Sequence, residues 1–534
     1  MIDKLSSQMR IILATVLAFL FFAVYDHYFI PKNTLEAQTT QVANDKKDAS
    51  SNTQSSQAPV SSSMTSSTDV AAAAPITQAK ENEIIATIKA PSYEMKIDKL
   101  GRIAKFILLE EKYRDDKGEQ LQLVDISQNL LPLEIRFSEK AVNEDAFVMS
   151  YTADKSVIDV IEGGSTLVLT QTLNGVIVTK TLTFFPSGKY DLHVKLSTSK
   201  DYFISPGYHT NVAVDSYTFH GAFVKKGDDT IKTISDGDAK GDEHFSVARI
   251  VAASDKYYTT FFYSFEKGLD TVVSVGKDKN PLLFVKGNED LTLSGYIGPK
   301  DHKVLKAINP ELTDVVEYGF FTFIAKPLFL LLSYLHDLFG NWGWAIVAMT
   351  ILIRLVLYPL TYKGMVSMNK LKELSPKIKE LQKKYADDKQ KLNMHMMELY
   401  KKHGANPMGG CLPILLQIPV FFAIYRVLQN AIELKGAAWI FWVHDLAVMD
   451  PYFILPVAMG ITMFLHQRIT PTSFTDPMQE KIMKFLPLIF TFFFVTFPAG
   501  LTLYWFTNNL ASIVQQTYVN KLFAKKREEE KVEK

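Results

Sequence analysis

The sequence predicts a multi-domain membrane protein in which an all-β sandwich domain precedes an all-α core of five transmembrane helices, with one further anchor helix at the N-terminus. Residues 166–183 alternate apolar and polar side chains around Asn174-Gly175, which is typical of a β-hairpin with a tight turn. Residues 317–520 instead contain long apolar runs, interrupted by one lysine-rich segment. These two patterns separate a β-domain from a helical membrane domain.

Composition excludes several function classes. The chain has 534 residues, more than one compact domain usually holds, and a net charge of +1. That balance does not indicate sequence-specific nucleic-acid binding. The single cysteine, Cys411, excludes an intrachain disulfide framework and a cysteine-rich metal site. We expect no metal and no cofactor.

The N-terminal segment predicts a membrane anchor, in residues 1–30. Lys4 and Arg10 precede an apolar run at residues 11–24, a pattern shared by anchors and by cleaved signal peptides. No small-x-small cleavage motif follows, which favours an uncleaved anchor with a cytoplasmic N-terminus. Residues 31–80 are rich in Ser, Thr, Gln, Ala and Asn, and we expect a flexible linker there.

Residues 81–315 predict one large antiparallel β-sandwich in the periplasm. Four further period-two segments accompany the hairpin, at residues 190–196, 257–264, 271–275 and 291–297. The histidines of this region are scattered and form no metal-spaced cluster: His193, His209, His220, His244 and His302. The pattern favours a binding or spacing domain, and a sugar-active sandwich remains the alternative.

The first apolar helix after the β-domain is amphipathic. Within residues 318–339, five polar residues fall on one helical face: Thr322, Lys326, Ser333, His336 and Asp337. This stripe predicts a helix lying in the outer membrane interface, within residues 316–341. Counting it as a span would place the following lysine-rich loop outside the cell, which the distribution of positive charge disfavours.

Residues 342–520 predict the five-span core. The expected spans are residues 344–361, 412–428, 452–465, 485–497 and 501–518. Together with the anchor they place both termini in the cytoplasm of a multi-pass inner-membrane protein. Eleven lysines lie in the loop at 363–411, whereas the outer loop at 433–450 has only Lys435. The third and fourth spans are short, which predicts local thinning of the bilayer.

The lysine-rich loop predicts a cytoplasmic helical hairpin. Ser375-Pro376 is typical of a helix start, Asp387 or Asp388 of a second N-cap, and Gly404 of a helix end. An apolar face joins the two helices: Ile378, Leu381 and Tyr385. Its length and caps favour a docking surface over a plain connector.

Arg354 is the candidate functional residue of the core. It lies near the middle of the first span, and no Asp or Glu occurs inside any of the five spans. Because a guanidinium in hydrocarbon is costly, we expect a water-filled cavity whose anionic partner comes from another molecule. Gln417 lies at a similar depth, on the cytoplasmic side. Other polar residues of the core are candidates for the cavity or for interhelical hydrogen bonds: Thr350, Tyr425, Arg426, Gln429, Tyr504, Asn508, Asn509, Gln515 and Gln516.

Four segments carry a family resemblance: Gly340-Asn-Trp-Gly-Trp, Asn406-Pro-Met-Gly-Gly-Cys-Leu-Pro-Ile-Leu-Leu-Gln-Ile-Pro-Val-Phe, Pro471-Thr-Ser-Phe-Thr-Asp-Pro-Met-Gln and Phe497-Pro-Ala-Gly-Leu-Thr-Leu-Tyr. They resemble the signature of the YidC membrane protein insertases of the YidC/Oxa/Alb group, in the Gram-negative form with a large periplasmic domain. The resemblance implies that the periplasmic domain is a super-β-sandwich and that the core contains a groove open to the cytoplasm and the bilayer. In it Arg354 attracts acidic residues of a translocated segment, and Thr350, Gln417 and Tyr504 occupy matching positions. Asn508 is the fifth candidate.

The resemblance also implies partners and a mode of action. These are nascent membrane proteins, the Sec translocon, ribosomes carrying nascent chains, and membrane lipids, with insertion and chaperone activity instead of an enzymatic reaction. The tail at 521–534 mixes lysines with glutamates, so it lacks a long basic segment for ribosome docking. Two alternatives differ in class: an ion-coupled transporter, which requires intramembrane acids or inverted repeats, and an envelope carbohydrate-binding protein that uses the sandwich.

Overall fold

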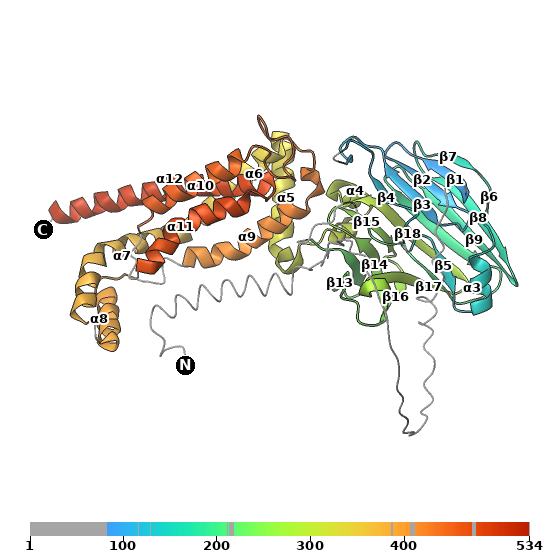
Figure 1. Ribbon diagram of the computed structural model, residues 1–534, viewed down its shortest axis with the longest axis horizontal. Coiled ribbons are helices and arrows are strands. Elements are labelled where there is room, and N and C mark those ends of the chain that lie inside the picture. The colour runs from blue at the N-terminus through green and yellow to red at the C-terminus, as the bar shows by residue number, and fades with distance from the viewer. Residues whose placement is uncertain are drawn as a thin grey trace, which may run out of the picture. The chain divides into compact units, whose positions relative to one another are not determined.

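A computed structural model of the chain describes residues 83–532, apart from 116, 129, 211, 213–217, 386–387, 406–411 and 472–476. These residues form two compact units, here termed the β-domain (83–315) and the helical domain (316–532; Figure 1). The predicted anchor, the predicted linker and parts of two family motifs, at 406–411 and 472–476, lie outside the described residues.

The smaller sheet of the β-domain has five strands. In spatial order they are β4 (Gln122–Val124), β3 (Ile103–Leu108), β2 (Tyr93–Asp98), β1 (Ile84–Lys89) and β7 (Val157–Asp159). Every pair is antiparallel except β1 with β7, which run parallel. The predicted all-antiparallel arrangement is therefore wrong at this edge.

The larger sheet has thirteen strands. The main path is β5 (Ile135–Phe137), β11 (Tyr202–Ile204), β17 (Pro281–Gly287), β16 (Leu269–Val275), β14 (Glu243–Ser254), β15 (Tyr258–Tyr263), β18 (Asp290–Pro299), β10 (Lys189–Leu196), β9 (Val176–Phe184), β8 (Ser165–Leu173) and β6 (Thr152–Ala153). A side branch pairs β12 (Gly221–Lys226) with β13 (Ile231–Ser235) and β14. The predicted hairpin is confirmed, because Leu173 pairs with Val176 across the turn and Gly175 has a φ of 82°.

The two sheets pack into the predicted sandwich. Lys180 on β9 is fully buried, and its Nζ donates to the carbonyl oxygens of Gly101 (3.0 Å) and Leu133 (2.8 Å). Burial lowers the pKa of Lys180 to about 7. The Tyr93 hydroxyl of the small sheet donates to the carbonyl oxygen of Phe185, which follows β9 (3.0 Å). Alternate residues along β8 and β9 are buried, as the period-two pattern predicts.

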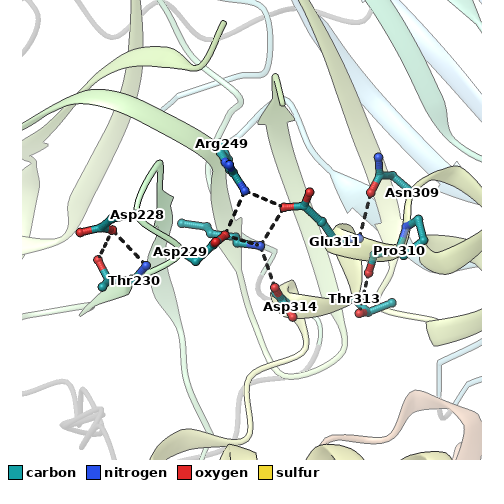
Figure 2. Close-up of polar contacts among 10 residues, drawn as sticks. Asp228, Asp229, Thr230, Arg249, Asn309, Pro310, Glu311, Thr313 and Asp314 are labelled. Atoms are coloured by element: carbon teal, nitrogen blue, oxygen red, sulfur yellow. Dashed lines mark hydrogen bonds and ion pairs between the residues drawn. The ribbon is translucent and has the colours of Figure 1, made fainter. Parts of the chain in front are cut away.

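Charged side chains gather where the β-domain ends. The chain leaves the sheet through α4 (His302–Ile308) and η4 (Pro310–Val315). In this ion cluster the Lys225 Nζ lies 3.0 Å from Glu311, 2.9 Å from Asp314 and 3.3 Å from Asp229. Figure 2 labels these three carboxylates. Arg249 also contacts Asp229 and Glu311. The cluster ties η4 to the turn between β12 and β13 and to β14.

The described helical domain contains eight main helices: α5 (Thr322–Phe339), α6 (Trp342–Val356), α7 (Tyr358–Lys384), α8 (Lys389–Lys402), α9 (Leu412–Asn430), α10 (Ile454–Ile469), α11 (Pro477–Phe494) and α12 (Ala499–Val532). Helix α12 packs against α6 and α10, and α5 packs against α6 and α9 (Figure 1). The two-domain fold class predicted from the sequence is confirmed.

The first predicted span is wrong at its end. Instead of continuing to residue 361, the helix ends at Val356, and α7 begins at Tyr358 with a 65° bend. Pro359 in the first turn of α7 explains the break, since a proline has no N–H with which to continue the hydrogen bonding of α6. Among the described residues, Gly319–Phe339 alone is long and apolar enough to span a membrane as one helix, and the bent α6–α7 pair qualifies as a second span. The interfacial position of residues 316–341 therefore stays a prediction.

The prediction of the hairpin is wrong for the start of its first helix and correct for both ends of its second helix. Helix α7 runs through Pro376 and does not begin there. Leu374 and Ile378 on either side of this proline are buried against α8, and this packing overrides the local signal. The cap of α8 is Asp388, whose Oδ1 accepts from the N–H of Lys391 (3.0 Å), as one of the two alternatives predicted. Gly404, with a φ of 57°, follows the end of α8 as expected.

Candidate functional site

All five predicted site residues line one cleft in the helical domain. Arg354 and Thr350 come from α6, Gln417 from α9, and Tyr504 and Asn508 from α12. They meet because α12 packs against both α6 and α9. The remaining lining residues are Ile353, Leu357, Thr361 and Val420. The cleft thus combines a cation, amides and hydroxyls with apolar walls.

Arg354 is held by uncharged groups. Its side chain is 9% exposed, and its Nε donates to Asn508 Oδ1 at 2.7 Å. The Gln417 Nε2 donates to the same oxygen at 3.3 Å, and Gln515 donates to the Arg354 carbonyl oxygen at 3.4 Å. Among the residues that the structure describes, no carboxylate pairs with Arg354. Amide dipoles therefore orient the guanidinium without neutralising it.

The other polar groups of the cleft are placed by their own helices. The Thr350 hydroxyl donates to the carbonyl oxygen of Ile346 (2.7 Å), one turn earlier in α6. Tyr504 is buried on α12 at the cleft wall. Within the described ranges, no group of three or more His, Cys, Asp or Glu side chains could hold a metal ion. The arrangement suits reversible binding of an anionic or polar chain segment.

Three other candidate residues make contacts outside the cleft, and one of these contacts joins two helices. The Asn509 Nδ2 lies 3.5 Å from the carbonyl oxygen of Met459 on α10, and Gln516 donates to Asn520 (2.8 Å). Tyr425 packs edge-on against Phe497. Asn509 therefore follows the alternative assignment, in which membrane amides join helices, whereas the Gln516 bond lies within α12 and Tyr425 of α9 contacts the turn that precedes α12.

The structure adds a polar junction that the sequence analysis missed. The Asn369 Nδ2 on α7 donates to Asn520 Oδ1 on α12 (3.0 Å), and the Asn520 Nδ2 donates to the carbonyl oxygen of Ile469 at the end of α10 (3.0 Å). Three helices, α7, α10 and α12, are joined in this way near the middle of α7. A lone asparagine within a lysine-rich sequence gives no signal of such a role.

The similarity of the chain to known proteins shows its family. A family model described as the 60Kd inner membrane protein matches residues 334–527, and one described as the YidC periplasmic domain matches residues 85–331. The membrane protein insertase YidC of Campylobacter jejuni is 53% identical over 98% of both chains. That of Wolinella succinogenes is 54% identical over 98% of this chain and 97% of its own. The chain belongs to the YidC family of membrane protein insertases.

Membership in the YidC family confirms the resemblance carried by the four motifs. The chain is a bacterial inner-membrane protein, and its β-domain is the periplasmic domain of this family. Neither alternative class, transporter or carbohydrate-binding protein, is favoured by these relatives. One solved structure, titled "Active YidC insertase crystal structure with the first transmembrane domain resolved", matches with 18% identity and a TM-score of 0.38, covering 84% of this chain and 95% of that chain.

Proposed function

We propose that this protein inserts nascent membrane proteins into the inner membrane and assists their folding there, alone or together with the Sec translocon, without an enzymatic reaction. The observation that carries the proposal is the buried Arg354, which bonds to the amide oxygen of Asn508 and to no carboxylate of the described chain, while Gln417 donates to the same amide oxygen. The names of the relatives, all insertases, support it.

The cleft acts through the charge of Arg354. Arg354 lies in the last turn of α6, because the helix ends at Val356, and not near the middle of its span as the sequence predicted. A buried guanidinium inside a membrane protein is still costly, up to about 2.5–3.5 kcal/mol at a helix centre on insertion scales, so water or an anion accompanies it. An acidic residue near the translocated end of a client provides that anion. Gln417, Tyr504 and Asn508 offer hydrogen-bond partners to the polar backbone beside it. In a hydrated cleft, the attraction between the Arg354 guanidinium and a client carboxylate exceeds that in bulk water, yet it remains weak enough for the client to be released.

Two short helices support a second contribution to insertion, which is local thinning of the bilayer. Helix α10 has 16 residues, which at roughly 1.5 Å per residue covers about 24 Å, against a hydrocarbon core of about 30 Å. The apolar part of α11, Met483–Phe494, is shorter still. A bilayer that thins around these helices presents a lower barrier to a polar segment.

The proposed topology places the N-terminus and the tail in the cytoplasm, residues 316–341 in the outer interface, and the hairpin at 363–411 in the cytoplasm. Its support is the excess of lysine in the hairpin over the outer loop. The hairpin has its own apolar core, with Leu374, Ile378 and Ala405 packed against Met396 and Leu399. We propose that this ordered basic surface recruits ribosome-bound clients.

Crosslinking tests whether the cleft receives the client. A photoreactive residue at Gln417 or Tyr504 should crosslink to the apolar segment of a stalled nascent membrane protein. The matched control is Val457, an exposed residue on α10 outside the cleft. Equal crosslinking from Val457 and from the cleft positions would contradict the proposal.

Charge substitution tests the role of Arg354. For a client with an acidic translocated segment, Arg354→Lys should retain most insertion, Arg354→Ala should reduce it and Arg354→Glu should reduce it further. A lysine placed in that client should partly restore insertion with Arg354→Glu. Protease protection of the client in cells reports each outcome, and a client without acidic residues is the control. Insertion by Arg354→Glu equal to wild type would exclude the charge mechanism.

A further inference from the structure

The loop between α9 and α10 is pinned to the start of α6. The Asn341 Nδ2 lies 3.0 Å from the carbonyl oxygen of Ala438 and 3.3 Å from that of Trp439. A Cβ added at Gly343 would collide with the Trp439 ring, so this glycine allows the indole to lie directly on the helix backbone. The Trp439 ring also contacts Trp344 edge-on, with 5.7 Å between centroids. One side of the loop therefore has a fixed position.

The same loop is pinned at two further points. The backbone N–H of Ala499 donates to the Val448 carbonyl oxygen (2.7 Å), and that of Gly500 donates to the Leu446 carbonyl oxygen (2.9 Å), at the start of α12. Together with Asn341, these bonds hold the loop across the neighbouring ends of α6 and α12. Ordinary surface loops lack such a framework.

Asp450 connects the loop to the first turn of α10. Its carboxylate is 1% exposed and accepts three hydrogen bonds, from the Trp442 Nε1 (3.0 Å), the Tyr452 N–H (3.0 Å) and the Leu455 N–H (2.7 Å). Donors from both sides satisfy this buried charge. The loop and α10 consequently form one rigid piece.

Apart from His444, the large side chains that this rigid loop exposes are apolar or aromatic. They are Phe441, Val448, Met449, Tyr452 and Phe453. Phe441 is 80% exposed, and both Phe441 and Phe453 have a positive φ, 53° and 57°, in the left-handed region that bulky residues avoid. The framework therefore holds two phenylalanines in unfavourable backbone conformations while leaving their rings uncovered.

The exposed face of α10 indicates what covers these rings. One stripe of that helix exposes Ile454, Val457, Ile461 and Leu465. Such a stripe faces lipid in an inner-membrane protein, and Tyr452 and Phe453 continue it directly into the loop. Between residues 441 and 453, the exposed titratable side chains are His444 and Tyr452, and the single carboxylate besides the buried Asp450 is the half-buried Asp445, whereas a protein-binding surface carries a charged and polar rim. Aromatic rings without charges suit the boundary between headgroups and acyl chains.

We propose that residues 437–453 form a lipid anchor, here termed the aromatic loop, whose Phe441, Tyr452 and Phe453 side chains insert at the headgroup–acyl boundary. The leaflet is the one at the N-terminal end of α10, the outer leaflet in the topology proposed above. Trp439 and Trp442, the residue types expected at an interface, are engaged inside the protein. Because Asp450 locks the loop to α10, the anchor sets the depth at which this short helix begins.

Site-specific fluorescence tests the anchor on the full chain in vesicles of phosphatidylethanolamine and phosphatidylglycerol. The chain has one cysteine, so Cys411→Ser provides the background for single Phe441→Cys, Val457→Cys and Lys240→Cys variants carrying an environment-sensitive dye. Val457 is the lipid reference, and Lys240, exposed on the β-domain, is the water reference. Quenching by a shallow acyl-chain nitroxide at position 441 should lie within about twofold of that at 457, with little quenching by aqueous iodide.

Two results would overturn the anchor. A dye at 441 that responds to iodide as the dye at 240 does would place the loop in water. Protection from both quenchers would show a protein partner or a second copy of the chain on this surface.

A substitution separates anchoring from folding. Asparagine tolerates the left-handed region, so Phe441→Asn relieves the backbone while removing the ring. With the dye at Val457, Phe441→Asn should change shallow-nitroxide quenching by at least about 1.5-fold, whereas Phe441→Trp should leave it unchanged. Quenching at 457 that does not respond to Phe441→Asn would overturn the role in setting helix depth.

Discussion

Each domain contains buried arginines, and two of them, Arg102 and Arg354, are held in opposite ways. In the β-domain, Arg102 is 2% exposed and bonds to Asp98 (2.8 Å) and Glu134 (3.0 Å), which also binds Arg136. In the helical domain, Arg354 bonds to the amide oxygen of Asn508. The first cation is neutralised within the fold, whereas the second is oriented and left uncompensated by the described residues.

The difference shows how burial alone fails to identify a functional charge. A buried arginine surrounded by carboxylates is satisfied, and its removal harms the fold because the carboxylates then lose their partner. A buried arginine with only dipolar partners retains its attraction for an external anion. Arg102 therefore serves structure, and Arg354 is available for binding.

The largest effect is expected from Arg102→Met. Asp98 and Glu134 would remain buried with one cation fewer, so the β-domain should lose about 3–5 kcal/mol of stability. Urea unfolding of the full chain in detergent, followed by the β-sheet circular dichroism signal, measures this loss. Arg354→Met is the matched control, and it should change the free energy of unfolding of the β-domain, taken from the same urea transition, by less than about 1 kcal/mol. Similar losses in both variants would remove the distinction between the two arginines.

Asn508→Asp should give Arg354 a carboxylate partner, as Arg102 has in the β-domain. A carboxylate at the position of the amide oxygen, 2.7 Å from the Arg354 Nε, would neutralise the guanidinium inside the cleft. Insertion of clients with acidic translocated segments should fall about tenfold, corresponding to ~1.4 kcal/mol in the barrier. Protease protection measures it, with Asn508→Ser and a client without acidic residues as controls. Full activity of Asn508→Asp would show that a free cation is not required.

Sequence reasoning found the polar part of the cleft and missed the rest. Polar side chains are conspicuous in apolar helices, and the family motifs include Gln417 and Tyr504, so the convergence of the five site residues was predictable. Ile353 and Val420 also line the cleft, yet apolar residues in an apolar span carry no such signal. The break at Leu357 was missed because the apolar run continues through it, although Pro359 marks the break in the sequence.

In the β-domain, local patterns were informative wherever contacts are between chain neighbours. The hairpin turn at Asn174-Gly175 was predictable for that reason. The parallel pairing of β1 with β7 joins Thr87 to Val157, and such long-range pairing leaves no mark on either strand. The network of Arg102 with Asp98 and Glu134 was equally inaccessible, because ordinary charged residues from separate segments form it.

His209 provides a pH-dependent counterpart to the permanent pairs of Arg102. Burial opposes its protonated form, but the hydrogen bond to Asp236 (2.6 Å) and the charge of that carboxylate outweigh burial and raise the pKa of His209 above its usual 6.5. A raised pKa means that the pair stabilises the fold fully below pH 6.5, and that this stabilisation disappears as pH rises through the folded-state pKa.

The measurement compares wild type with His209→Gln. The stability advantage of wild type, about 1 kcal/mol for a charged hydrogen bond, should be greatest near pH 5.5 and should shrink steadily toward pH 9. Urea unfolding of the full chain at several pH values supplies the difference. An advantage that grows with pH would show that the neutral imidazole is the favoured form.

The smallest effect is expected where charges are paired but remain in contact with solvent. In the ion cluster of Figure 2, Arg249 is 30% exposed, and its partners Asp229 and Glu311 are more exposed still. Water and salt screen such pairs, so Arg249→Met should cost only about 0.2–1 kcal/mol, and 0.5 M salt should remove most of the difference. Lys140→Met, which breaks a fully surface pair with Glu144 at 3.9 Å, should cost still less. The assay is the same urea unfolding at low and high salt. A loss comparable to that of Arg102→Met would mean that the number of ionic contacts, and not the exclusion of water, determines the cost of removing a paired cation in this domain.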